Sequence, residues 1–489
     1  MRDLIRRAPR DSTFFAALGL FALLLAWILS SPVMSSPDEA AHLIRGISAA
    51  EGEWRGSAVA ETTTVNIATA NTRSFTLPGR LAVIDRAPCY AFRPDVPASC
   101  APTYSLGAAT ESSHVGTYYP LLYIPLGSAE RMAGNVSDAI YAGRVASALI
   151  CLFFLLISFR LSARHSWSRV AWYLAVGPLT VYLSSSAATN GIEVASSICF
   201  VCVSIALTER PPTRTLWAIW AIAGVALASA KTMGPLFVVF DLALVLSFTR
   251  SARWWVREAR KRPIAFGSVA ASALASGAWT VSYQRSPQAS GAISYSHYAS
   301  QALRGMASGV QGVFSQFGWL DAKTPGDLWI AGDLVVVVLM AVAWRRIDIV
   351  ARSTLLTGTV LAGVITFGVT FVEARGGYGF QSRYTLAILA PIPLLAVSGW
   401  SADFVDRVGP RVCLTLMIAL DAAALYGNGR RYAVGSHGSL FFLGDAKWIP
   451  PGGWLLVTLL AVIGLSSLAL AGAMGSESSS KKREVISTH

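Results

Sequence analysis

Charged side chains are scarce in this sequence, and that scarcity excludes several classes of protein. Only 14% of the 489 residues are Asp, Glu, Lys or Arg, against roughly 25% in soluble domains. So few charges could not cover the surface of a soluble chain of this length, which excludes an ordinary cytosolic enzyme. Hydrophobic residues make up 54% of the chain, which excludes a disordered protein as well.

Cysteine, histidine and nucleotide-binding motifs are also scarce or absent. Six cysteines are too few for a disulfide-rich secreted scaffold. The six histidines form no HExxH pattern, and no zinc site is predicted. The sequence has neither a Walker A loop nor a Rossmann glycine fingerprint, so ATP-driven transport by this chain is not expected.

Long apolar runs are what the sequence does contain. A bilayer core of about 30 Å needs roughly 20 apolar residues per helical span. An outer-membrane barrel would show alternating strands instead. We therefore predict an all-α, polytopic transmembrane protein with about twelve spans, at 13–31, 138–159, 169–187, 192–208, 215–232, 233–249, 264–283, 328–344, 353–372, 384–400, 411–427 and 453–472.

The net charge of +13 predicts an orientation. With twelve spans, all short basic segments fall on one side, at 2–10, 160–169, 250–262, 345–352 and 481–483. The positive-inside rule makes that side the cytoplasm and places both termini there. Residues 1–472 then form one transmembrane domain, and 473–489 a disordered cytoplasmic tail. Because orientation explains the charge, no nucleic-acid partner is predicted.

The opposite side carries the longer loops. Residues 32–137 form a large first extracytoplasmic loop, and 284–327 and 428–452 form two smaller ones. Cys89 and Cys100 both lie in the first loop, and outside the cytoplasm they would form a disulfide; two free thiols are the alternative. A long first external loop with short cytoplasmic loops suggests that the chemistry takes place on the outer face.

The first external loop begins with an acidic segment. Ser36, Pro37 and Glu39 match a capping box with proline at the first helical position. A helix is therefore predicted from here, and Leu43 and Ile47 suggest that it lies along the membrane interface.

Three polar residues of this segment, Asp38, His42 and Arg45, are spaced so that they share one helical face. Charges at a bilayer edge are costly, so Asp38, Glu39 and His42 are candidate catalytic residues and Arg45 a candidate substrate ligand. The alternative is that the two carboxylates only stabilise the helix N-terminus.

Several basic residues lie at the same membrane edge. A lipid-linked phosphate would supply an anion for them, and arginine binds phosphate with two donors. Snorkelling toward lipid headgroups is the alternative. The candidates for lipid-phosphate binding are, in order, Arg383, Lys231 and Arg144, followed by Arg430 and Arg431.

Five further residues are candidates for substrate contact. Asn190 and Glu193 either cap a helix or contact an acceptor or a metal. Trp319 and Asp321 suit sugar binding, although tryptophan also anchors proteins at the interface. Tyr119 belongs to an aromatic segment that begins a second juxtamembrane helix and packs at the interface or against a lipid.

These residues fall in motifs through which the chain resembles a bacterial family of predicted membrane proteins of unknown function, and more distantly the GT-C glycosyltransferases. Two positions depart from the family pattern, where Gly191 replaces a proline and Ser382 a glycine. The motifs are Pro37-Asp38-Glu39-Ala40-Ala41-His42, Tyr118-Tyr119-Pro120-Leu121-Leu122-Tyr123, Asn190-Gly191-Ile192-Glu193, Gly318-Trp319-Leu320-Asp321, Gln381-Ser382-Arg383-Tyr384 and Trp448-Ile449-Pro450-Pro451-Gly452-Gly453.

The GT-C resemblance implies an inverting enzyme of the bacterial plasma membrane. It would move a hexose or pentose from a polyprenyl-phosphate sugar to a cell-envelope glycan or glycolipid. Asp38, or Glu39 if the capping assignment is reversed, would be the general base. Arabinofuranose or another cell-wall sugar fits the resemblance. No cofactor is required, although Asp38 and Glu39 could hold a divalent metal.

A transporter or flippase for lipid-linked saccharides is the main alternative, and a passive scaffold in a polysaccharide complex is the third. A transporter would place charges near the bilayer midplane and break helices there. The charges lie mostly at the outer edge, and the mid-span runs read as uninterrupted. The sequence therefore favours the enzyme.

Overall fold

The computed structural model describes residues 2–59, 71–100, 109–162, 165–284, 294–376, 378–398, 400 and 408–484. Helices dominate, because a helix satisfies its own backbone hydrogen bonds without water. In the described part, seven helices are long and apolar enough to cross a bilayer: α1 (Arg2–Ser30), α5 (Val136–Ser162), α8 (Asn190–Glu209), α12 (Pro263–Tyr283), α15 (Ile349–Arg375), α18 (Val408–Val434) and α19 (Gly453–Glu484).

The other five predicted spans coincide with shorter helices. Three of them are single helices, α9 (Arg214–Ala230), α10 (Gly234–Thr249) and α14 (Ile330–Arg346). The structure thus confirms a multi-pass helical protein with several long apolar helices. About twelve spans remains a prediction.

Two predicted spans are broken, so the expectation of uninterrupted runs is wrong there. Segment 169–187 divides into α6 (Ser166–Ala175) and α7 (Pro178–Ser184), and segment 384–400 into α16 (Leu386–Leu389) and α17 (Ile392–Ser398). A proline lies at each break, Pro178 or Pro391, and proline has no N–H for the preceding turn. Both regions are buried in protein, which is where interrupted helices are tolerated at membrane depth.

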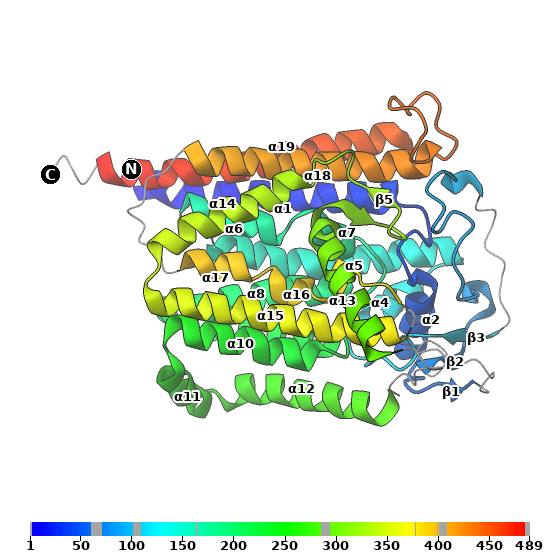
Figure 1. The fold of residues 1–489 in the computed structure, drawn as a ribbon, viewed down its shortest axis with the longest axis horizontal. Coiled ribbons are helices and arrows are strands. Elements are labelled where there is room, and N and C mark those ends of the chain that lie inside the picture. Colours follow the sequence, from blue (N-terminus) through cyan, green and yellow to red (C-terminus); the bar gives the residue numbers. More distant parts are fainter. Residues whose placement is uncertain are drawn as a thin grey trace.

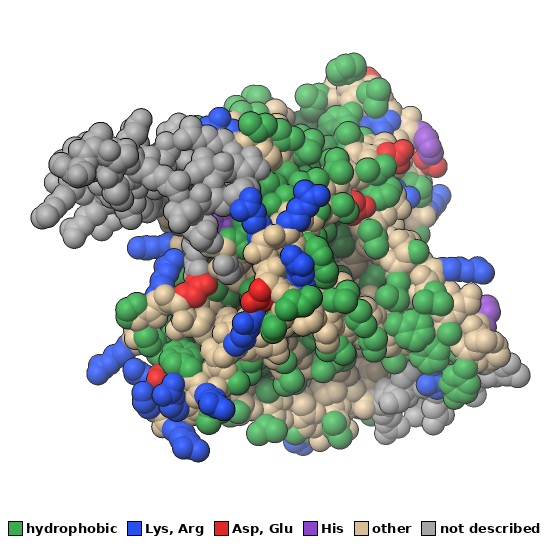
Figure 2. Space-filling view, turned by 60° about the vertical axis from the view of Figure 1, so that its left-hand side comes forward, with side chains coloured by type: hydrophobic (Ala, Val, Ile, Leu, Met, Phe, Trp, Pro, Cys, Tyr) green, Lys and Arg blue, Asp and Glu red, His purple; other side chains and the backbone are tan. Residues whose placement is uncertain are grey.

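The helices run roughly side by side, and the two ends of the bundle differ (Figure 1). The beginning of α1, the end of α19 and the basic helix α11 (Ala252–Lys261) lie at one end, and the described part of the first loop lies at the other. Lys and Arg side chains gather over α11 (Figure 2). This arrangement agrees with the predicted grouping of the basic segments on one side.

The first external loop is partly folded rather than open. Strands β1 (Ser57–Ala58), β2 (Arg73–Thr76) and β3 (Thr110–Ser113) form an antiparallel sheet. Two short 3₁₀ helices follow the second strand, η1 (Gly79–Leu81) and η2 (Ala98–Cys100). Cys89 and Cys100 form the predicted disulfide. The loop closes with α4 (Tyr123–Glu130), the second juxtamembrane helix expected from the sequence.

Helix α2 (Glu39–Ala50) is buried from Glu39 to Ala49, so the prediction that it lies along the lipid interface is wrong. Its apolar residues Leu43 and Ile47 belong to a core cluster with the sheet and the start of α5. On another side α2 packs on α4, where a side chain at Gly127 would lie 1.8 Å from the carbonyl oxygen of Gly46. Protein therefore takes the place that lipid was expected to fill.

The remaining predicted loops also contain structure. Segment 284–327 holds helix α13 (Tyr295–Ser315) and the two-stranded sheet of β4 (Gln316–Phe317) and β5 (Ala322–Lys323); its residues 285–293 lie outside the described part. Segment 428–452 begins inside α18. Helix α19 reaches Glu484, and the end of the predicted tail, 485–489, lies outside the described residues.

Candidate functional site

Asp38 lies at the junction between α1 and α2, directly before the first residue of α2. The predicted capping box is wrong, because α2 begins at Glu39 and Asp38 makes no side-chain cap. Asp38 instead has a left-handed backbone, with φ 66° and ψ 10°. Aspartate tolerates this region better than most residues, yet it costs about 1–3 kcal/mol and is common at functional sites. The carboxylate is consequently free for other partners.

Those partners are Arg383 and His114. Arg383 lies in the short helix η3 (Ser382–Tyr384), and its Nη2 donates to Asp38 Oδ2 over 2.8 Å. His114 Nε2 lies 3.5 Å from the other carboxylate oxygen, Oδ1. His114 Nδ1 in turn contacts Asp85 Oδ2 at 2.7 Å. Four alternating acidic and basic side chains are thus linked in a row, which we call the charge chain: Asp85, His114, Asp38 and Arg383.

The charges in this chain determine the protonation of Asp38. Burial alone would raise the pKa of its carboxyl group, but Arg383 and His114 outweigh burial and hold the pKa well below its usual range. The side chain nevertheless keeps 29% exposure. Asp38 is therefore an ionised carboxylate that a ligand from solution or membrane can reach.

A small pocket lies beside Asp38. Its wall includes Pro37 and Arg383 from the two segments that meet at Asp38, and Tyr182 of α7. Gln316 and Gln381 add side-chain amides to the lining. The pocket thus combines apolar surface with a few polar groups next to the Arg383 partner of Asp38, and its cavity volume of about 20 Å³ holds about one water.

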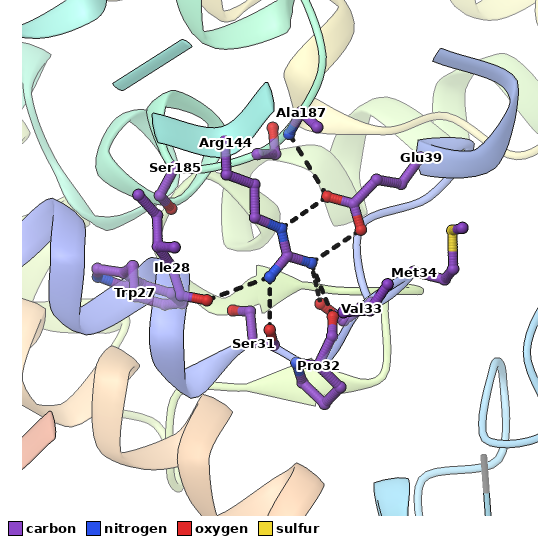
Figure 3. A network of polar contacts seen from close by, with 12 residues as sticks. Trp27, Ile28, Ser31, Pro32, Val33, Met34, Glu39, Arg144, Ser185 and Ala187 are labelled. Carbon is purple, nitrogen blue, oxygen red and sulfur yellow. Dashed lines mark hydrogen bonds and ion pairs between the residues drawn. The ribbon is translucent and has the colours of Figure 1, made fainter. Parts of the chain in front are cut away.

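The Glu39 carboxylate differs from that of Asp38 in its burial and in its partner (Figure 3). Its two carboxylate oxygens accept from Nε and Nη2 of Arg144, each over 2.8 Å, and both side chains are almost fully buried. Arg144 Nη1 donates to the carbonyl oxygens of Ile28 and Ser31, and Nη2 also donates to that of Pro32. The pair therefore ties α5 to the end of α1 and the start of α2.

These contacts correct three predictions. Arg144 has its guanidinium hydrogens engaged by protein, so it is not a lipid-phosphate ligand. Both oxygens of the fully buried Glu39 carboxylate accept from that guanidinium, so Glu39 is not a candidate base, and a metal bridging Asp38 and Glu39 does not fit. Snorkelling does not describe Arg144 either, because it is 1% exposed.

His42 and Arg45 lie behind Asp38 in the protein interior. His42 Nδ1 contacts the Tyr123 hydroxyl at 2.7 Å, and burial lowers the pKa of His42 to about 3. Arg45 donates through Nε and Nη2 to the carbonyl oxygen of Tyr118. Both residues fix α2 against the segment around α4, and the predicted shared face is used for this packing rather than presented to a substrate.

The residues of the predicted helix-start motif, Asn190 and Glu193, are buried at the beginning of α8. Thr189 precedes the helix without a side-chain cap, and Asn190 is its first residue, so the predicted cap is misplaced. Among the described residues, neither oxygen of the buried Glu193 carboxylate has a hydrogen-bond partner. Lys231, between α9 and α10, is close enough to interact electrostatically with Glu193 and Arg383. Glu193 and Lys231 therefore remain part of the candidate site.

Two predicted phosphate ligands hold loops in place instead. Arg431 Nη2 donates to Asp321 over 2.7 Å, and the guanidinium also donates to carbonyl oxygens of the disulfide loop. Arg430 donates to the carbonyl oxygens of Gly438 and Ser439. Asp321, expected to bind substrate, is thus the counterion of Arg431. The structure supports neither arginine as a phosphate ligand.

The aromatic candidates have structural partners. Trp319 Nε1 donates to the carbonyl oxygen of Met34, and its ring meets Phe92 edge to face with centroids 5.2 Å apart. Tyr119 meets Trp279 of α12 in the same way at 5.8 Å. These rings brace the segments on either side of the site.

Sequence reasoning missed three residues: His114, Asp85 and Glu130. The first two lie in the external loop without any recognisable spacing, so the sequence holds no signal for their contact. Glu130 is completely buried at the end of α4, where burial and the Glu39 carboxylate raise the pKa of its carboxyl group well above the usual range.

The fold and site define a multi-pass helical membrane protein with a polar site at the end of the bundle that carries the long loop. Residues 21–392 match a family described as "Predicted membrane protein (DUF2142)", and the chain belongs to that family. The matched segment includes Asp38, Asp85, His114 and Arg383. No curated protein and no solved structure matches the chain.

Proposed function

We propose that the protein is a glycosyltransferase of the bacterial plasma membrane that moves a sugar from a polyprenyl-phosphate donor to a cell-envelope glycan or glycolipid. The observation that carries the proposal is Asp38, an ionised and partly exposed carboxylate held by Arg383 beside a pocket. A carboxylate is the group that such a transfer needs to receive the proton of the acceptor hydroxyl. The GT-C resemblance, not the family match, suggests the donor and the extracytoplasmic location of the site.

In the proposed reaction, the acceptor oxygen attacks the anomeric carbon of the sugar. The bond from that carbon to the phosphate oxygen breaks, and the hydroxyl proton passes to Asp38. A carboxylate with so low a pKa is a weak base, so it takes the proton as the new bond forms and the hydroxyl becomes acidic.

Arg383 would affect both the departure of the phosphate and the uptake of the proton by Asp38. A phosphate beside Arg383 would share its guanidinium with Asp38, and the leaving phosphate gains negative charge as the bond breaks. Sharing also weakens the hold of Arg383 on Asp38, which makes the carboxylate a better base. Lys231 supplies a second cation near the same place.

A saccharide transporter or flippase is the second candidate, and two observations favour it. The breaks at α6–α7 and α16–α17 are the interrupted helices that transporters use. Asp241 and Asp421 are buried inside α10 and α18, so ionisable residues are not confined to the outer edge.

The test is turnover by the purified protein in nanodiscs with a panel of polyprenyl-phosphate sugars and acceptors. We expect transfer by the wild type, a loss of at least about 100-fold in Asp38→Asn, and normal transfer in Asp445→Asn, an exposed acid on the last external loop. Full activity of Asp38→Asn refutes the base. If no donor is consumed but lipid-linked sugar crosses liposomes containing the protein, the transporter is correct.

A further inference from the structure

The charge chain Asp85–His114–Asp38–Arg383 contains two residues to which the proposed reaction gives no role so far. Asp85 Oδ2 contacts His114 Nδ1 at 2.7 Å and also accepts the His114 backbone N–H at 3.3 Å. One carboxylate therefore fixes both the ring and the backbone of His114, directly after β3. The opposite ring nitrogen points at Asp38.

The imidazole faces a carboxylate on each side, which determines its protonation. A neutral imidazole has a single N–H and would turn a lone pair toward one of the two carboxylates. Only the imidazolium offers a hydrogen to both. The geometry thus favours the protonated ring and alternating charges along the whole charge chain.

The two oxygens of Asp38 are held unequally. Oδ2 accepts from Arg383 over 2.8 Å, a full charge-assisted hydrogen bond. Oδ1 lies 3.5 Å from His114 Nε2, an ion-pair distance that leaves lone-pair capacity unused. Asp38 makes no cap bond to α2, so these two cations set the orientation of its carboxylate.

We propose that His114 and Asp85 are positioning residues that orient Asp38 so that its Oδ1 accepts the proton of the acceptor hydroxyl. This proposal rests on the proposed glycosyl transfer. In that step the acceptor O–H bond breaks, the proton joins Oδ1, and the electron pair of the O–H bond stays on the attacking oxygen. The cleaved phosphate ester leaves with its own bonding pair, so neither oxidant nor further co-reactant is needed.

The surroundings support a charged His114. Burial alone would lower its pKa, but the hydrogen bonds and charges of Asp38 and Asp85 raise it to about 10. Within the described ranges, the other titratable groups on this side of the site are His42 on α2, held neutral by burial, and Arg383 beyond Asp38.

Two measurements test the proposal, and the first is independent of activity. In protein with isotope-labelled histidine, we expect the His114 imidazole, identified by its loss in His114→Gln, to titrate near pH 10 and at lower pH in Asp85→Asn. The second is the pH dependence of transfer. His114→Gln should lower kcat by about 10–100-fold, leave KM for the donor nearly unchanged, and move the acidic limb of the profile to higher pH. A residue that served only folding would not move that limb.

The protein provides a matched control in His437 and Asp95, another His–Asp pair, in which both side chains are more than half exposed. His437→Gln and Asp95→Asn should leave kcat and the pH profile unchanged. If His114 titrates near 6.5 while Asp38→Asn is inactive, the positioning role is refuted and the transfer stands. If His114 titrates near 10 but Asp38→Asn is fully active, the proposed function fails and the positioning role fails with it.

Discussion

Replacing Arg144 by methionine tests whether the Glu39–Arg144 pair holds the fold together or serves a lipid. The substitution keeps the apolar stem and removes the guanidinium. It leaves the buried Glu39 carboxylate with the backbone N–H of Ala187, at 3.4 Å, as its remaining described hydrogen bond. It also removes the donor to the carbonyl oxygens of Ile28, Ser31 and Pro32 at the end of α1.

Removing one partner of a buried pair costs about 3–5 kcal/mol, because the other charge is left uncompensated. That is a large fraction of the roughly 5–15 kcal/mol by which proteins are stable. We expect Arg144→Met to unfold at clearly lower temperature in detergent, followed by tryptophan fluorescence, and to give less monodisperse protein. Glu39→Met/Arg144→Met should recover much of the loss, since no charge is then buried alone.

The matched control is Arg250→Met, which breaks an ion pair with Asp348 whose side chains are more than half exposed. Exposed pairs contribute little, so we expect no measurable change in unfolding temperature. If Arg144→Met unfolds like Arg250→Met, Arg144 does not stabilise the fold. If Arg144→Met folds normally but loses lipid-dependent activity alone, Arg144 is a lipid ligand and the assignment made here is wrong.

Three further predictions follow from other contacts. Gly127→Ala should lower folded yield and unfolding temperature severely, because its methyl group would overlap the Gly46 carbonyl in the α2–α4 contact; Gly134→Ala, in open space, is the control. Cys89→Ser should cost about 3 kcal/mol, measured as a lower unfolding temperature that reducing agent does not lower further. The raised pKa of His114 stabilises the fold fully below about pH 6.5, and this contribution is lost as pH rises through about 10; the decline should be smaller in His114→Gln, and an equal decline would contradict it.

The helices and the disulfide could be predicted because their causes are local. A run of roughly 20 apolar residues meets the thickness of a bilayer, and each predicted span indeed coincides with a helix or a broken pair. The disulfide joins two cysteines in the same loop, 11 residues apart. The two prolines at the helix breaks are present in the sequence. The mean hydropathy of a whole segment does not reveal so short an interruption, so both segments were predicted as continuous spans.

The partners of the charged residues could not be predicted because they lie far apart along the chain. Asp38 and Arg383 are separated by 345 residues, and Glu39 and Arg144 by 105. The sequence shows that an arginine lies at a membrane edge. It does not show whether the guanidinium binds carbonyl oxygens of the protein or is available to a phosphate. The capping box failed for the same reason, since the Glu39 carboxylate has a distant arginine as its partner.

The adjacent residues Asp38 and Glu39 show how the fold assigns different roles to similar groups. Glu39 has an arginine of its own and is buried with it, so its charge is fully compensated within the protein. Asp38 is paired with Arg383, which also lines the neighbouring pocket, and Asp38 remains partly exposed.

The same comparison reduces the number of residues that could form the proposed phosphate site. Arg144, Arg430 and Arg431 are bound to protein oxygens, which leaves Arg383 and Lys231 among the five predicted ligands. An anion arriving there must compete with Asp38 for Arg383, and that competition would increase the basicity of Asp38 at the moment the donor is bound. A carboxylate whose arginine can also bind the substrate phosphate would therefore become a stronger base only when substrate is bound. A carboxylate such as Glu39, whose arginine is bound only within the protein, would not change in this way.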